Sequence, residues 1–160
     1  MKMLRELRRH LAEMNVVDEE GIYLWPEELQ FQNTWKVQGN GIEVSRARYK
    51  AMAAIERWPH DKVPVQVLAA NLALWMNEHR RHLVEDDSNI HMDADIQDDK
   101  TADIEIGIAF EESIEVSEVP EGEASKPNDI EALGKRWRVR DVVIDVAEHA
   151  EVDDPGYELP

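Results

Sequence analysis

Two runs of alternating apolar and polar residues make up the stretch Ile90-His-Met-Asp-Ala-Asp-Ile-Gln-Asp-Asp-Lys-Thr-Ala-Asp-Ile-Glu-Ile-Gly-Ile-Ala-Phe110. Apolar side chains occupy every second position up to Ile96 and again from Ile104 onward, with Asp98-Asp99-Lys100-Thr101 between the runs. A period of two is the pattern of a strand with one buried and one solvated face. The stretch therefore predicts an antiparallel hairpin.

The solvated face of this predicted hairpin is acidic. Its polar positions include Asp93, Asp95, Asp103 and Glu105. Clustered carboxylates can hold divalent metal ions, as in two-metal nucleases. The alternation instead places these side chains on a wet strand face, so we interpret them as a solvated acidic surface. A weak ion site and a nuclease stay open as alternatives.

A calcium-binding loop does not fit the same segment. When Asp93 is counted as the first position, the sixth is Asp98 where an EF-hand requires glycine, and the twelfth is Ile104 where glutamate belongs. The segment is therefore not predicted to be an EF-hand loop.

Two helices are predicted outside the hairpin. Between Met3 and Asn15, apolar residues recur at helical spacing. A second helix follows Asp61, which can cap it, and Pro64, which suits a first turn. Its apolar face consists of Val65, Leu68, Leu72 and Trp75.

A further hairpin is predicted over Leu29–Arg46, because Gly39-Asn40-Gly41 suits a tight turn between two apolar strands. Residues 47–58 fit either a strand or a helix by periodicity. Together these elements predict an α+β fold, mostly antiparallel sheet packed against two main helices, with an extended hairpin.

The C-terminal third is predicted to be less regular. We expect one domain over residues 1–150, a loop excursion over 119–134, and a loose, flexible acidic tail over 151–160. Alternation around Trp137 changes phase to Val142, Ile144 and Val146, which predicts a strand with a bulge near Arg140-Asp141.

The overall charge excludes several functions. The chain has 160 residues, no cysteine and a net charge of −17. Residues 1–80 carry as many acidic as basic residues, so all of this charge resides in residues 81–160. Such a surface repels a phosphate backbone, so specific nucleic-acid binding is not expected. The sequence also predicts no membrane span, no signal peptide and no disulfide, which favours a reducing cytosol.

Several side chains are candidates for protein contacts. The basic strip Lys135, Arg136, Arg138 and Arg140 is either a solvated strand face or a contact with the acidic hairpin face, in the same subunit or a neighbouring copy. His79 and His82 have a spacing that can bind metal, but they also suit a helix C-terminus.

The five tryptophans are candidate anchors. We expect Trp35 and Trp75 in the core, and Trp25, Trp58 and Trp137 at interfaces. No Gly-x-Ser-x-Gly, Walker or dinucleotide motif is present, so the sequence predicts no catalytic, cofactor or metal residues. These features favour a protein that binds other proteins over an enzyme.

The order of the elements resembles the tail completion protein R family of temperate contractile-tailed phages over about residues 1–120. The segments that carry the resemblance are Leu4-Arg5-Glu6-Leu7-Arg8, the strand beginning Arg48-Tyr49, the helix ending Leu72-Ala-Leu-Trp-Met-Asn-Glu78, and the strands around Asp93–Ile96 and Thr101–Ile104, continuing to Glu111 and Val116. Residues 126–160 depart most from the family pattern.

The resemblance implies a strand over Arg48–Trp58 and a structural role without enzymatic residues. Subunits of the family complete the tail by forming a ring, expected to be a hexamer, at the head-proximal end of the tail tube. The implied partners are other copies, the tail tube and sheath proteins, and the head–tail connector, while DNA passes without specific binding. The implied locations are the host cytoplasm during assembly and then the virion tail or neck.

The acidic face fits such a ring, because a channel lined by Asp93, Asp95, Asp103 and Glu105 would repel passing DNA. Two other functions stay open. One is another neck or minor tail connector protein, and the other is an acidic DNA mimic that inhibits a nucleic-acid-binding protein.

Overall fold

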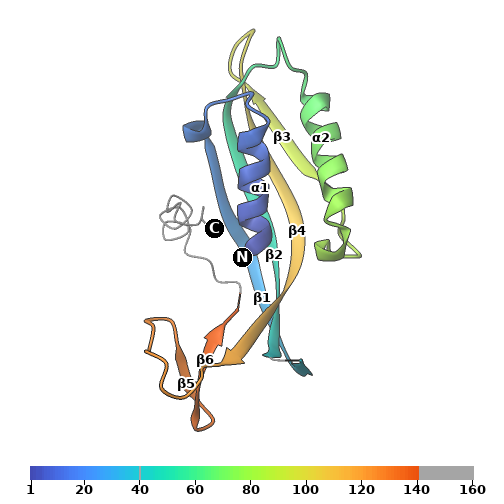
Figure 1. Ribbon diagram of the computed structural model, residues 1–160. Coiled ribbons are helices and arrows are strands. Elements are labelled where there is room, and N and C mark those ends of the chain that lie inside the picture. The colour runs from blue at the N-terminus through green and yellow to red at the C-terminus, as the bar shows by residue number, and fades with distance from the viewer. Residues whose placement is uncertain (40, 141–160) are drawn as a thin grey trace, which may run out of the picture. The chain divides into compact units, whose positions relative to one another are not determined.

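The computed structural model describes residues 1–39 and 41–140. The chain divides into two compact units, Met1–Glu115 and a second that begins at Val116. The elements in chain order are α1 (Lys2–Glu13), η1 (Glu19–Gly21), β1 (Ile22–Gln38), β2 (Gly41–Trp58), α2 (Val65–Glu78), η2 (Arg80–His82), β3 (His91–Ile96), β4 (Ala102–Glu118), β5 (Ile130–Ala132) and β6 (Lys135–Val139) (Figure 1).

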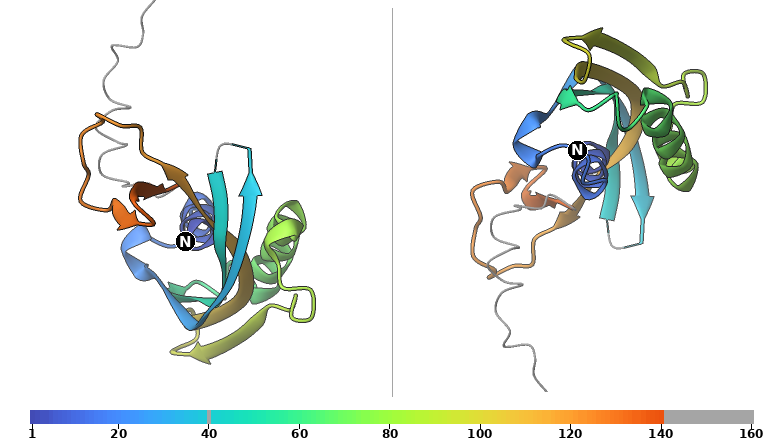
Figure 2. Two further views of the ribbon diagram at one scale, coloured as in Figure 1. Left: turned by 90° about the horizontal axis from the view of Figure 1, so that it is seen from below. Right: turned by 90° about the horizontal axis from the view of Figure 1, so that it is seen from above.

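The first unit is built on a curled sheet. β1 and β2 pair antiparallel from the Ile22↔Ile55 pair to the Gln38↔Gly41 pair, and β4 lies on the other side of β2. β3 pairs antiparallel with the first part of β4, with Met92 opposite Ile106. Figure 2 shows the strands of this unit curling around α1.

Two bulges interrupt the pairing of β1 with β2. The register shifts between Glu27 and Gln30 and again between Asn33 and Lys36. A residue with positive φ lies at each shift, Glu28 at 54° and Trp35 at 87°. An extra residue in one strand bends it and increases its twist. The bulges therefore account for much of the curl of this long hairpin.

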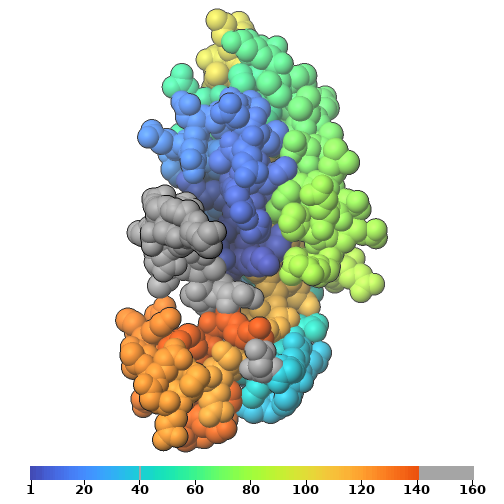
Figure 3. Space-filling model, in the orientation of Figure 1, coloured from blue at the N-terminus to red at the C-terminus, as the bar shows by residue number. Residues whose placement is uncertain are grey.

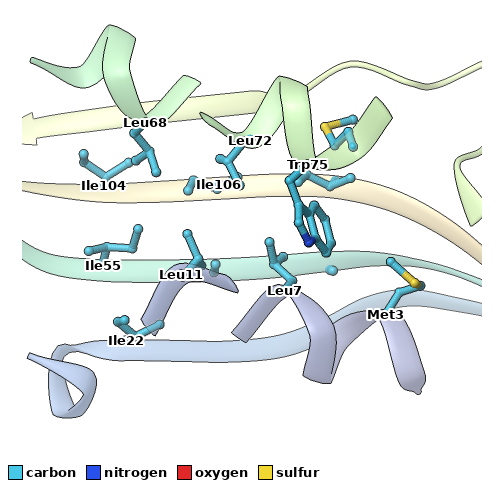
Figure 4. Packing of buried hydrophobic residues seen from close by; sticks show 14 of the residues in the cluster. Met3, Leu7, Leu11, Ile22, Ile55, Leu68, Leu72, Trp75, Ile104 and Ile106 are labelled. Atoms are coloured by element: carbon cyan, nitrogen blue, oxygen red, sulfur yellow. The ribbon is translucent and has the colours of Figure 1, made fainter. Parts of the chain in front are cut away.

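Both helices pack on the same face of the sheet. The ring of His10 in α1 stacks on Trp75 in α2 with centroids 5.3 Å apart, and His10 Nε2 also contacts Asn71 Oδ1. Buried side chains from both helices and from the strands form one cluster, which includes Leu7, Leu11, Leu68, Leu72, Ile55, Ile104 and Ile106 (Figure 4). The predicted α+β class, mostly sheet with two main helices, is confirmed.

The ambiguous residues 47–58 belong to strand β2, as the family resemblance implies. Tyr49, Ala51, Ala53 and Ile55 alternate toward the helices and are at most 2% exposed. The alternative helix over residues 47–58 does not form, because the strand period of two buries all four of these side chains in the core.

The start of the second helix differs from the prediction. α2 begins at Val65 with Pro64 at the N-cap position, and no side chain caps it. Asp61 is not the cap, because the backbone N–H of Val63 bonds to the carbonyl of Pro59 (2.8 Å) in a separate turn before the helix.

The two arms of the β3–β4 pair are buried unequally. On β4, Ile104, Ile106 and Phe110 are at most 1% exposed. β3 has β4 as its single strand neighbour in the described residues, and its Ile96 is 58% exposed. The predicted buried face is therefore complete on the β4 arm only. β4 itself runs on to Glu118 and includes most of the predicted third stretch of the sheet.

The second unit contains the end of β4 and the β5–β6 hairpin. Val116 pairs with Val139, and Ile130 pairs with Trp137. The two-residue turn of the hairpin, Leu133-Gly134, has positive φ at both positions, as a type I′ turn requires. The predicted loop over 119–134 thus contains strand β5. The predicted bulge at Arg140-Asp141, the continuation of the strand to Val146 and the tail 151–160 extend outside the described residues.

Candidate interaction surfaces

The predicted acidic side chains share one face of the β3–β4 pair. In the register, Asp93 lies opposite Glu105, and Asp95 lies opposite Asp103. Like charges directly opposite each other in a sheet are destabilising. Asp93, Asp95 and Glu105 are exposed, so water screens this repulsion. Asp103 is half-buried and accepts a hydrogen bond from the backbone N–H of Arg57 (2.9 Å).

Asp98, another aspartate of the stretch from Ile90 to Phe110, stabilises the β3–β4 turn. Asp98 Oδ1 accepts hydrogen bonds from the backbone N–H groups of Lys100 (2.8 Å) and Thr101 (2.6 Å). These bonds hold the pKa of Asp98 below its ordinary value. Within residues 1–39 and 41–140, no group of three or more His, Asp or Glu side chains is placed to hold a metal ion.

The basic strip is paired with acids of its own unit. Arg138 donates to both oxygens of Asp129 (2.7 and 3.0 Å), and Lys135 Nζ lies 2.8 Å from Glu118. The side chain of Asp129 is 2% exposed, and hydrogen bonds from Arg138 and from the backbone of Lys126 lower its pKa to about 2. Arg136 lies 3.7 Å from the same carboxylate, and Arg140 directly follows β6. The strip therefore holds the second unit together.

The division of the tryptophans between core and surface differs from the prediction. Trp75 is in the core as expected, but Trp58 is also there, at 1% exposed, and donates its indole N–H to the carbonyl of Val63 (2.7 Å). Trp58 is therefore not available as an interface anchor. Trp35 is 58% exposed although we expected it in the core. The bulge at Asn33–Lys36 takes it out of the strand alternation.

The other two interface candidates are half-buried and hydrogen-bonded. The indole N–H of Trp25 donates to Glu27 (2.8 Å), and that of Trp137 donates to the carbonyl of Ala132 (3.0 Å). Lys135 Nζ lies 6.0 Å from the centre of the Trp137 ring.

The two histidines differ in their relation to the end of α2. His79 occupies its C-cap position, where Nδ1 lies 2.9 Å from the carbonyl oxygen of Trp75 and the ring packs against the Trp75 ring at 4.5 Å. His82 lies in η2, and burial and the charge of Arg81 lower its pKa. His79 is therefore at the helix end as expected, whereas the lowered pKa of His82 does not favour a cation that would interact with the helix dipole.

Two acids of the first unit, the half-buried Glu112 and the buried Glu43, have structural partners. Glu112 accepts hydrogen bonds from the hydroxyl of Tyr49 (2.5 Å) and from the backbone N–H of Met3 (3.0 Å). Glu43 is 2% exposed and accepts a hydrogen bond from Ser113 (2.8 Å). Burial raises the pKa of Glu43, but the bond from Ser113 and the nearby charge of Arg46 outweigh it, so the net shift is downward.

Two apolar surfaces were missed by the sequence analysis. The first, which we call the hairpin end, consists of Leu29, Phe31, Trp35 and Val37, all 43–75% exposed on β1. The second, which we call the outer face of α2, consists of Gln66, Val67, Ala70, Ala73, Leu74 and Asn77. The sequence could have indicated the outer face of α2, because no charged residue occurs between Val63 and Asn77.

The family model of the P2 phage tail completion protein R (GpR) matches residues 1–136. The chain belongs to this family. The match continues past residue 120 and includes β5, so part of the segment that departed most in the sequence analysis is also covered.

A relative supports the assignment of this tail completion protein. The chain is 32% identical over 132 residues to the "Uncharacterized 19.2 kDa protein in rep-hol intergenic region" of Haemophilus phage HP1 (strain HP1c1). The aligned part covers 81% of this chain and 76% of the relative. No solved structure matches the chain.

Family membership gives the protein a structural role in the phage tail, where it interacts with other tail components in the virion. In the part of the chain that the structure describes, no helix has the length and apolar character needed to cross a membrane.

Proposed function

We propose that the protein completes the tail by forming a ring, most simply a hexamer, at the head-proximal end of the tail tube. The observation that carries the proposal is the family match over residues 1–136, which includes the whole first unit. In this proposal one side of the ring contacts the tail tube and the sheath, and the other side receives the head–tail connector.

In the proposed ring, the acidic face of the β3–β4 pair faces the central channel. The carboxylates of Asp93, Asp95, Asp103 and Glu105 line the channel, where they repel the phosphates of the DNA that passes. Support comes from the register, which puts all four on one face of the sheet. A density map of assembled tails that showed this face at the outer rim of the ring would contradict the assignment.

The ring is tested by native mass spectrometry of the full chain across a concentration series, alone and mixed with tail tube protein. We expect a discrete oligomer of ring size in the mixture, because the end of the tube supplies the template. A chain that stays monomeric or dimeric in both samples, and that does not bind the tube protein, would reject the ring.

A second candidate function is favoured by the same acidic face. The four carboxylates and the net charge of −17 would also suit a mimic of DNA that blocks a basic protein. Such a mimic would bind host nucleases or repressors as a monomer and would lose that binding at high salt. Binding to the tube protein that persists at high salt would favour the tail ring instead.

A further inference from the structure

The hairpin end is an uncharged surface on a strongly acidic protein. It lies on β1, which is an edge strand of the sheet, and its Phe31, Trp35 and Val37 are 58–75% exposed. The segment Leu29–Gln38 contains one charged residue, Lys36, and no acid. Exposed aromatic and aliphatic side chains gathered in this way mark a contact site more often than a solvated surface.

The outer face of α2 is also exposed and uncharged. The exposed positions of α1 are all charged, namely Lys2, Arg8, Arg9 and Glu13. On α2, no exposed residue before Glu78 carries a charge, and Leu74 is 72% exposed. A helix that is uncharged on its outer side as well as its inner side is typical of a helix covered on both sides.

A groove extends the outer face of α2 at its C-terminal end. Met76, Leu83, Val84 and Ile90 line it together with Ala73 of the same face, and the other half of the lining is polar: Asn77, Arg80, Glu85, Ser88 and Asn89. The apolar half offers a place for a large apolar side chain from a partner.

The two surfaces lie at separate places on the first unit. Figure 3 shows α2 along one flank and the β1–β2 hairpin end at the bottom of the view. A contact between two different surfaces of the same chain is heterologous, and repetition of it produces a ring when the rotation between neighbouring copies closes. The partner must be apolar and must lack acidic residues, and a second copy presents such a surface.

We infer that the hairpin end of one copy packs on the outer face of α2 in the next copy. Phe31 and Trp35 contact Val67 and Leu74, and an aromatic ring enters the adjoining groove. The inference rests on the proposed ring and names the subunit contact within it. Like-charged copies can meet in this way because neither surface contributes an acidic residue.

The absence of native cysteine permits a direct test. We would prepare Val37→Cys for the hairpin end, Ala70→Cys for the outer face of α2, and Ala94→Cys on β3 as the control. These changes keep Phe31, Trp35 and Leu74. A short flexible bis-maleimide, which imposes no disulfide geometry, would cross-link each variant alone and in pairs.

We expect the mixture of Val37→Cys with Ala70→Cys to form heterodimers in several-fold higher yield than either variant alone. The mixture of Val37→Cys with Ala94→Cys should not show this excess. Equal yields in all samples would overturn the inference, because they indicate random collision. A ring that forms on the tail tube without the selective cross-link would overturn the inference and leave the proposed function intact.

A second readout uses charge insertion. Trp35→Asp and Leu74→Asp each remove one half of the contact, so each variant alone should stay monomeric under conditions in which the unmodified chain associates. A mixture should form heterodimers and nothing larger, because it retains one intact pair of surfaces. Ile96→Asp, at a position as exposed as Trp35, should associate normally. If either single variant self-associates like the unmodified chain, the inference is wrong.

Discussion

Glu112 joins three parts of the first unit through a single carboxylate. It accepts hydrogen bonds from the Tyr49 hydroxyl on β2 and from the backbone N–H of Met3 in the first turn of α1. No side chain of α1 caps its own N-terminus, so a residue of β4 supplies the negative charge that the helix dipole favours there.

We predict that Glu112→Ala lowers the free energy of unfolding by about 2–3 kcal/mol, because a buried hydroxyl and a helix N–H both lose their acceptor. Glu112→Gln, which keeps an acceptor oxygen, should restore part of the loss. Urea unfolding followed by circular dichroism would measure the effect. The matched control is Glu111→Ala, whose half-exposed pair with Arg46 should contribute less than about 1 kcal/mol.

Individual residues also show where sequence patterns stop being informative. The alternation correctly placed Ile104 and Phe110 in the core, because burial of one strand face is periodic. Trp35 was misplaced, since a bulge shifts the alternation by one residue and the sequence carries no plain signal for a bulge. Trp58 was misplaced for a different reason. We expected Trp58 at an interface, but the turn that follows β2 supplies an acceptor, the carbonyl of Val63, for its indole N–H inside the core.

At the scale of elements, both helices and the turns of the long hairpins were predictable. The start of β1 at Ile22 and the second half of β2 were not predictable from periodicity, and neither were the partners of polar side chains. The basic strip of β6 was expected either in solvent or against another acidic surface. Arg138 instead pairs with Asp129, which lies in the segment just before β5. Such pairing depends on how a loop folds back, and charge patterns along a strand do not specify that.

The Asp129 pair predicts an acid-sensitive second unit. The pKa of Asp129 is about 2 in the folded chain and 3.8 ordinarily, so its contribution to stability is present above 3.8 and is lost as the pH falls toward 2. We expect the β5–β6 hairpin to open in this window. The indole N–H resonance of Trp137, which is hydrogen-bonded in the folded unit, would report the opening by NMR.

The control variants separate this effect from general acid unfolding. Asp129→Asn should open the hairpin already at neutral pH and remove its transition between pH 3.8 and about 2. Glu121→Gln, at an exposed position of the same unit, should leave the transition in place. An unchanged Trp137 resonance in Asp129→Asn would show that the carboxylate does not hold the hairpin.

At the scale of the whole molecule, the sequence identified the family, but no periodicity within one chain specifies an assembly. The acidic face was predictable because strand alternation defines it. The hairpin end and the outer face of α2 became visible only when exposure was known, since their apolar residues resemble core residues in the sequence.

The charge of the whole chain predicts how association responds to salt. Copies with a net charge of −17 repel each other, and a contact between uncharged surfaces loses nothing when salt screens charges. We expect association to be unchanged or stronger when NaCl rises from about 50 mM to about 500 mM. Sedimentation velocity would measure this. Dissociation at high salt would indicate an ionic contact instead, such as one through Arg136 and Arg140.

The bulges of β1 have a consequence for the free chain at high concentration. A long unpaired edge strand can template the addition of strands from other chains, and this leads to aggregation. The register shifts after Glu27 and Asn33 divide the edge of β1 into short segments. A chain with an exposed aromatic hairpin can therefore accumulate at high concentration in soluble form, because its edge offers no long straight template for uncontrolled stacking.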